Sequence, residues 1–112
     1  MKKICTYSDA ISNYNQAIKI NSKSFKVFNN RGNALSKLNK LEEALLSYEK
    51  AIKINSNDIY AHIFKAHICS EQGKFEEALL SYKNAYYINP EHPLLLGYIV
   101  NIKTKINQVI SL

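Results

Sequence analysis

The sequence "KLEEALLSYEKAIKIN" occupies residues 40–55, and "KFEEALLSYKNAYYIN" occupies residues 74–89. Eleven of the sixteen places are identical, so the second copy repeats the first in a fixed register. An Ala-Tyr-Ala set recurs at the same interval, as Ala10-Tyr14-Ala17, Ala44-Tyr48-Ala51 and Ala78-Tyr82-Ala85. A fixed period between about 20 and 50 residues is typical of proteins built from stacked repeats.

Each copy contains the pattern of an amphipathic helix. The apolar side chains of residues 41–54 recur at spacings of three and four, at Leu41, Ala44, Leu45, Tyr48, Ala51, Ile52 and Ile54. This spacing predicts a helix with one buried face. Residues 25–38 show similar spacing at Phe25, Phe28, Ala34, Leu35 and Leu38. Each repeat is therefore predicted to be two helices joined by short turns.

The residues between the helices suit helix ends. Asn39 in one copy and Gly73 in the next tolerate the left-handed backbone that often ends a helix. At the other joint we expect the same backbone, at Asn21, Asn55 and Asn89.

The helix starts carry their own signals. Ser24 and Asp58 are placed to cap the helices that follow them. Pro93 is expected at the first helical position of the last helix, where its missing N–H costs nothing.

One place in each helix carries a small residue. Gly32 and Ala66 are equivalent in the first helices, and the alanines of the Ala-Tyr-Ala sets are equivalent in the second helices. Small facing residues allow two helices to approach closely, and the tyrosines then fill a fixed gap.

These repeats resemble the tetratricopeptide repeat (TPR) family, whose 34-residue units are helical hairpins. In the copy 25–58, the family pattern falls on Phe28, Arg31, Gly32, Leu35, Ala44, Tyr48, Ala51 and Ser56. In the copy 59–92, it falls on His62, Lys65, Ala66, Cys69, Ala78, Tyr82, Ala85 and Pro90. Arg31 and Lys65 stand where the family prefers Leu, and we expect their stems to lie on apolar surface with their heads in water.

The resemblance implies an all-α fold of stacked antiparallel helix hairpins, a right-handed solenoid of the TPR type, in a single domain over residues 1–112. The expected parts are the second helix of a truncated repeat, two full repeats and a capping helix, at residues 7–22, 25–58, 59–92 and 94–111.

The two ends of this array are expected to differ, with an incomplete first repeat and a capping helix over the last one. The first copy begins in mid-repeat, so the face bearing Tyr7, Ile11 and Ile18 is expected to be partly uncovered. Either the chain is a segment of a longer array, or something else covers that end, for instance a second copy in a symmetric dimer. In the last helix, Val100 and Lys103 stand where the family places a small and an apolar residue, so no further standard repeat is expected to begin there. A second apolar patch is expected from Leu94, Leu96, Ile110 and Leu112.

Composition indicates a folded domain with 46% hydrophobic and 21% charged residues. The net charge of +6 comes from fourteen Lys and one Arg, and these residues are scattered along the chain. Scattered lysines favour a solvated surface over a nucleic-acid site. No secretory signal or membrane-spanning stretch is recognised, so a cytoplasmic protein with reduced Cys5 and Cys69 is expected.

No residues with catalytic or metal-binding spacing are found, so we expect neither an enzyme nor a cofactor. His62, His67 and His92 do not pair with ligands at metal-site spacings. His67 and Glu71 are four places apart and are expected to form a surface ion pair. Cys69 is equivalent to core-facing Leu35 and is expected to be buried.

In the TPR family, the first helices line a concave groove that holds extended peptides. The equivalent places here are Lys26, Asn29, Asn33, Ser36, Lys37, Tyr60, Ile63, His67, Ser70, Glu71, Asn101 and Lys105. Asn offers a donor and an acceptor for a peptide backbone, and Lys attracts acidic side chains or a terminal carboxylate. The resemblance thus predicts a non-catalytic protein–protein interaction module with a protein or peptide partner.

Three other interpretations of the same residues remain open at this stage. They are a polar face that is only solvated, a module for self-assembly as a homo-oligomer through the terminal helices, and an RNA-binding module like related helical repeats. The single Arg weighs against RNA.

A narrower role within the family is not predicted. Some members grip chaperone tails through a basic pair, but Tyr60 and Phe64 stand in that place here. A set begun one repeat later puts Leu94 and Tyr98 there. The sequence therefore does not predict a chaperone-tail clamp.

Overall fold

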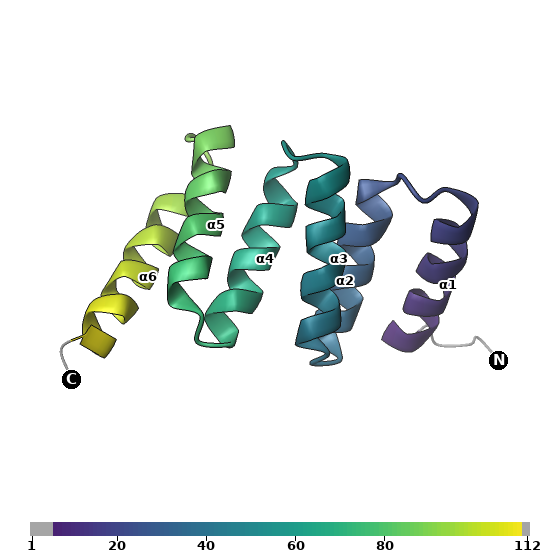
Figure 1. Ribbon diagram of the computed structural model, residues 1–112, viewed down its shortest axis with the longest axis horizontal. Coiled ribbons are helices and arrows are strands. Elements are labelled where there is room, and N and C mark those ends of the chain that lie inside the picture. Colours follow the sequence, from purple (N-terminus) through teal and green to yellow (C-terminus); the bar gives the residue numbers. More distant parts are fainter. Residues whose placement is uncertain (1–5, 111–112) are drawn as a thin grey trace. The chain divides into compact units, whose positions relative to one another are not determined.

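The computed structural model describes residues 6–110 of the chain, and every regular element in them is an α-helix (Figure 1). The six helices are α1 (Tyr7–Ile20), α2 (Phe25–Lys37), α3 (Leu41–Ile54), α4 (Ile59–Glu71), α5 (Phe75–Ile88) and α6 (Leu95–Ile110). These bounds agree closely with the helices predicted from the repeat. Within the described residues, no helix has the length and apolar character needed to cross a membrane.

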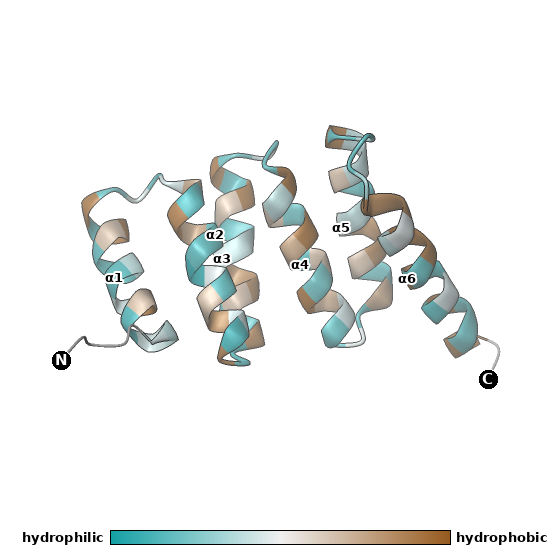
Figure 2. Ribbon diagram, turned by 180° about the vertical axis from the view of Figure 1, so that it is seen from behind, coloured by the Kyte–Doolittle hydropathy of each residue, from teal (hydrophilic) through white to brown (hydrophobic). Residues whose placement is uncertain are grey.

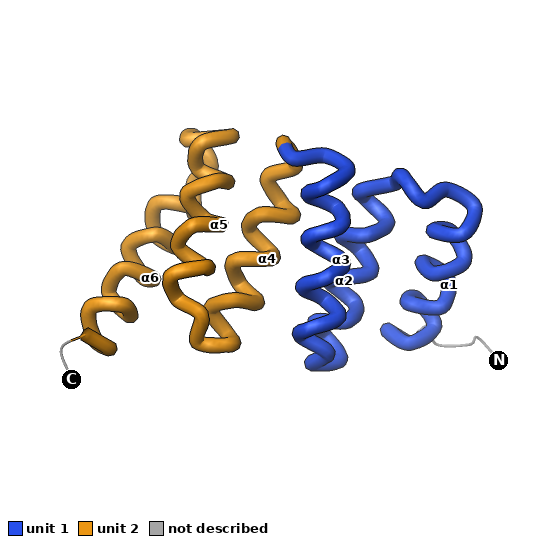
Figure 3. Tube along the Cα trace, in the orientation of Figure 1, with its two compact units in different colours: residues 1–56 blue, residues 57–112 orange. Residues whose placement is uncertain are grey.

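The chain divides into two compact units, Met1–Ser56 and Asn57–Leu112 (Figure 3). The first unit contains α1, α2 and α3, and the second contains α4, α5 and α6. In each unit the middle helix packs against both of the others, and neighbouring helices run antiparallel (Figure 1).

The hairpin of α2 and α3 closes over a tyrosine. A Cβ placed on Gly32 would lie 2.5 Å from the Tyr48 ring, so only a glycine allows this approach. Ala44 and Ala51 are fully buried on either side of Tyr48. In the hairpin of α4 and α5, Ala66 and the set Ala78-Tyr82-Ala85 are buried in the same way. The predicted packing of small residues against tyrosine is confirmed.

The two kinds of turn differ in their backbone. Asn39 and Gly73 have φ of 59° and 77°, so the left-handed conformation predicted for them is confirmed. The same prediction for Asn21, Asn55 and Asn89 is wrong, because their φ angles are −138°, −140° and −141°. These asparagines are extended. The Oδ1 atoms of Asn21 and Asn89 each accept a hydrogen bond, at 3.1 Å, from the backbone N–H two places later, so the side chain closes the turn.

The helix starts follow the capping signals only in part. Ser24 Oγ accepts a hydrogen bond from the Val27 N–H at 3.4 Å and caps α2. Asp58 occupies the cap position of α4, but its side chain makes no capping hydrogen bond to that helix. Pro93 is not helical, contrary to prediction, because α6 begins at Leu95. His92 orders the turn instead, since its Nδ1 accepts a hydrogen bond from the Leu94 N–H at 3.3 Å.

Arg31 connects all three helices of the first unit. Its Nε donates to Asn15 Oδ1 on α1 at 2.7 Å, and its Nη1 donates to Ser47 Oγ on α3 at 2.6 Å. The head of Arg31 is therefore half-buried and held by neighbouring side chains, which the sequence did not predict. The charged guanidinium forms strong hydrogen bonds with two neutral acceptors, which explains how the family's Leu place holds a cation.

We expect Gly32→Ala to lower the free energy of unfolding by roughly 1–3 kcal/mol, because the added methyl displaces the Tyr48 ring. Urea unfolding followed by circular dichroism measures this change. Gly97→Ala is the matched control, since Gly97 is an exposed helical glycine with open space around it. That substitution should raise stability by about 0.5–1 kcal/mol through helix propensity. Equal effects of the two substitutions would contradict the close contact at Tyr48.

Candidate functional site

The twelve residues predicted to contact a peptide fall into three classes of exposure. The exposed members are Lys26, Lys37, Tyr60, Glu71 and Asn101. The half-buried members are Asn33, Ser36, His67, Ser70 and Lys105. The first unit presents its members on α2, and the second presents them on α4 and α6.

Two predicted contact residues are buried. Asn29 is 8% exposed and Ile63 is 5% exposed, and Ile63 belongs to the apolar core. Each lies three places before the small residue of its helix, Gly32 or Ala66, and so shares the inward face of that helix. Neither side chain is available to a ligand at the surface, so these two leave the candidate site.

The central polar residue of each candidate surface is hydrogen-bonded to a core tyrosine. The Tyr48 hydroxyl donates to Asn33 Oδ1 at 2.6 Å. At the equivalent place of the next repeat, the Tyr82 hydroxyl lies 2.5 Å from His67 Nδ1. The side-chain oxygen of the half-buried Asn33 is thus already engaged within the fold. This pairing was not predicted from the sequence. In both hairpins, however, the two partners lie 15 residues apart in the chain.

Three aromatic rings, one from each helix, meet in the second unit. His67 and Tyr98 form a T-shaped pair with ring centroids 5.0 Å apart, and Tyr82 stacks on Tyr98 with centroids 5.3 Å apart. Tyr98 was not among the predicted site residues, although the sequence places it where some family members carry a basic residue. The cluster joins α4, α5 and α6 beneath the exposed residues of the second unit.

Burial determines the protonation of this cluster. Burial lowers the pKa of His67, and the nearby Glu71 carboxylate opposes that effect. Burial also raises the pKa of Tyr82 to about 12, with Tyr98 and Cys69 contributing in the same direction. Both shifts favour the uncharged forms of His67 and Tyr82, which share a hydrogen bond between the Tyr82 hydroxyl and His67 Nδ1. His67 is half-buried against two tyrosines, so it is not the purely surface partner of Glu71 that the sequence suggested.

Several other predicted residues have defined surroundings. Cys69 is fully buried, as predicted. Tyr60 stacks on Phe64 with centroids 6.2 Å apart, and Lys105 Nζ lies 5.7 Å from the centre of the Phe75 ring. Among residues 6–110, no group of three His, Cys, Asp or Glu side chains is arranged to hold a metal ion. Cys5 and Leu112 lie outside the described residues.

Comparison with solved structures shows close similarity in fold. The first TPR of Spaghetti (RPAP3) bound to the HSP90 peptide SRMEEVD has a TM-score of 0.86 and 20% identity, with 90% of this chain and 80% of that chain covered. The second TPR domain of human RPAP3, in complex with the HSP70 peptide SGPTIEEVD, has a TM-score of 0.81 and 24% identity, with 87% and 81% covered.

The TPR2B domain of yeast Sti1 in its pHsp70 complex has a TM-score of 0.79 and 26% identity, covering 91% of this chain and 83% of that chain. A comparison with curated protein sequences found no significant match.

Family models match most of the chain. Residues 25–58 and 59–92 each match a tetratricopeptide repeat model, and residues 6–39 match a TPR repeat model. The matched segments follow the hairpins seen in the structure. With three motifs over residues 6–92 and six helices paired as TPR hairpins, the chain belongs to the tetratricopeptide repeat family, whose fold is non-catalytic.

Proposed function

We propose that this chain is an interaction module that binds an extended, acidic peptide segment of a partner protein through the exposed side chains of its first helices. Similar domains support this, because those of Spaghetti and human RPAP3 are in complex with SRMEEVD and SGPTIEEVD. Each of these peptides has three acidic side chains near its C-terminal end. The net charge of +6 on the present chain favours a partner of that sign.

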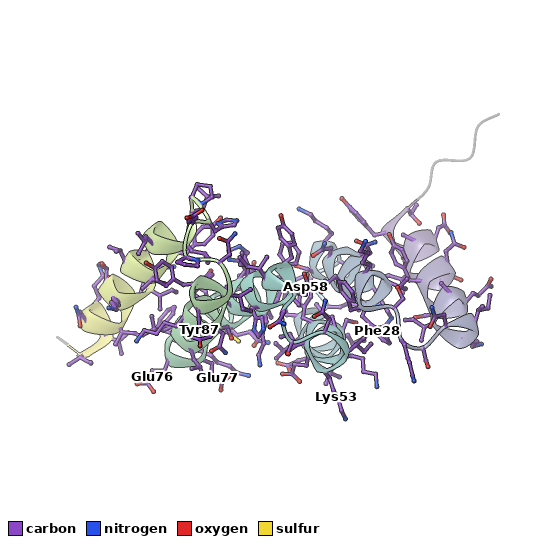
Figure 4. All side chains as sticks on the ribbon, turned by 90° about the horizontal axis from the view of Figure 1, so that it is seen from above. Phe28, Lys53, Asp58, Glu76, Glu77 and Tyr87 are labelled. Atoms are coloured by element: carbon purple, nitrogen blue, oxygen red, sulfur yellow. The ribbon has the colours of Figure 1, made fainter. Side chains whose placement is uncertain are left out.

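The observation that carries the proposal is the distribution of charge between first and second helices. In the first unit, the exposed Lys26 and Lys37 lie on α2, whereas Glu42 and Glu43 lie in the first turn of α3. In the second unit, Glu76 and Glu77 point outward from α5 (Figure 4). The second helices α3 and α5 thus begin with acidic pairs, and Glu71 is an exposed acid on α4, whereas α2 has no acidic residue and presents lysines for an acidic segment.

The aromatic stack on α4 adds an apolar contact. Tyr60 and Phe64 occupy the place where some family members carry a basic pair, and Tyr60 is 55% exposed. A stacked pair of rings suits an apolar side chain better than a carboxylate. For the surface of the second unit we therefore propose an apolar side chain of the partner as the ligand of this stack, and not a carboxylate held between two basic side chains.

Lys26→Glu should weaken peptide binding about threefold to tenfold, because it reverses an attraction at the edge of the contact. Binders are selected from a phage-displayed random peptide library, and their dissociation constants are measured by fluorescence anisotropy. The matched control is Lys53→Glu, which makes the same change of charge in the same unit at an outward position of α3 (Figure 4). An equal loss in both variants would contradict a surface on α2. Asn33→Ala is unsuitable here, because it removes the acceptor of the Tyr48 hydroxyl.

Stability should fall as the pH drops below about 6.5, the ordinary pKa of His. The folded state holds the pKa of His67 below that value, so protonation favours the unfolded chain, and the stabilisation present above a pH of about 6.5 is lost as the pH falls through the folded pKa. His67→Asn supplies the residue found at the equivalent Asn33 and removes this titration. Urea unfolding from pH 8 to 5 should show a smaller pH dependence for the variant. Parallel curves for both proteins would contradict the assignment.

A further inference from the structure

The helix α1 has the sequence of a second helix without its first. Its set Ala10-Tyr14-Ala17 is equivalent to Ala44-Tyr48-Ala51 on α3 and Ala78-Tyr82-Ala85 on α5. On α3 and α5 these residues are buried against the preceding first helix, whereas α1 has no buried residue. Within the described chain, nothing covers the face of α1 that the repeat reserves for a first helix.

The helix α6 occupies the place of a first helix, and no second helix follows it among the described residues. It packs against α5 through the buried Leu95, Ile99 and Ile102. The places that α2 and α4 turn toward their own second helices are exposed on α6. Leu96 is 58% and Val100 is 61% exposed, and the first turns of this helix are strongly apolar (Figure 2).

We propose that α6 of one copy of this chain pairs with α1 of a second copy, head to tail, and so forms a hairpin equivalent to those of α2 with α3 and of α4 with α5. The repeat register defines which residues meet. Val100 and Asn101 stand two repeats after Gly32 and Asn33, and Tyr14 stands one repeat before Tyr48. Each copy then adds six helices in the same alternation of first and second helices.

A hydrogen bond found in both complete hairpins has its two halves on these faces. In each hairpin the tyrosine hydroxyl of the second helix reaches a polar acceptor on the first, Asn33 or His67. At the equivalent places, α1 carries Tyr14 and α6 carries the exposed Asn101. Asn101 has the same side chain as Asn33, so the contact from the Tyr14 hydroxyl to Asn101 repeats a pairing already present in the fold.

The charges are also complementary. In the hairpin of α4 and α5, Cys69 Sγ lies 3.9 Å from Glu77 Oε2. The equivalent residues on the exposed faces are Lys103 of α6 and Asp9 of α1. Lys103 departs from the family pattern in a first helix, and an acid opposite it gives that departure a physical reason.

The same charges argue against symmetric pairing. Helix α6 contains two lysines and no acidic residue, so two copies of α6 would bring like charges together. The larger side chain of Val100 replaces Gly32 or Ala66 against the tyrosine, so the intermolecular hairpin is wider than the internal ones. A head-to-tail contact uses two different surfaces and therefore continues beyond two copies unless it closes into a ring.

Complementation of blocked variants tests this proposal. Val100→Glu blocks α6, and Tyr14→Lys blocks α1, with Ala10→Lys as a second block of α1 if the first fails to fold by circular dichroism. Sedimentation equilibrium up to millimolar concentrations of chain should show the mass of the unmodified chain rising with concentration. Each blocked variant alone should stay at the chain mass of 12.8 kDa. An equimolar mixture should form a dimer that grows no further, because one intact α1 and one intact α6 remain.

Other outcomes overturn the proposal. A dimer of Tyr14→Lys alone would show symmetric pairing through α6, and a dimer of Val100→Glu alone would show symmetric pairing through α1. An unmodified chain that stays monomeric, or a mixture that forms no dimer, excludes head-to-tail assembly. The matched control is Leu80→Glu on α5, because Leu80 is also apolar and 61% exposed. It should associate like the unmodified chain, and its dissociation would place the contact elsewhere.

Lys103→Glu provides a milder test of the register. It should raise the dissociation constant of association about threefold to tenfold, by placing two acids opposite each other. Val100→Glu should still bind the selected peptides, since Lys26 and Tyr60 are untouched. Failure of assembly and failure of peptide binding are therefore separate results.

Discussion

The contact between a tyrosine ring and a small residue on the facing helix determines how each hairpin is built. Tyr48 lies on Gly32, and Tyr82 and Ala66 are buried at the equivalent places, because only a small side chain leaves room for the ring between two close helices. Once the ring is fixed, its hydroxyl must find a partner, since an unsatisfied buried donor is costly. The next residue of the first helix, Asn33 or His67, supplies it. Core packing thus fixes a polar residue that also faces the candidate surface.

Within each unit taken by itself, this arrangement gives the candidate surface a fixed polar residue, and the surface of the first unit also has adaptable lysines. Asn33 and His67 are held by hydrogen bonds from below, and the rings of Tyr82 and Tyr98 hold His67 further. The lysines of α2 are exposed and have many rotamers, so they adjust to a ligand at an entropic cost. A fixed polar residue favours one path for the backbone of a bound peptide. Long lysine side chains select the charge of a ligand more than its exact shape. The surface is therefore suited to a class of segments more than to one sequence.

The two units solve the same packing problem with different residues. The first unit uses Arg31 to connect α1, α2 and α3 through hydrogen bonds. The second unit connects its three helices through the rings of His67, Tyr82 and Tyr98. One solution is polar and the other aromatic, although both follow the same repeat frame. The repeat thus determines which positions contact each other between helices, but it does not determine whether the contacting residues are polar or aromatic.

The sequence by itself determined the helices, their pairing and the small-residue contacts, because a fixed period repeats the same local pattern and the same packing. It also identified Asn39 and Gly73, since local backbone preference decides a left-handed turn. Tertiary structure alone decided that Asn29 and Ile63 are buried, that Arg31 reaches two other helices and that Tyr98 joins the site. Those outcomes depend on which neighbouring helix lies across from each side chain, and a pattern along one chain contains no such distance.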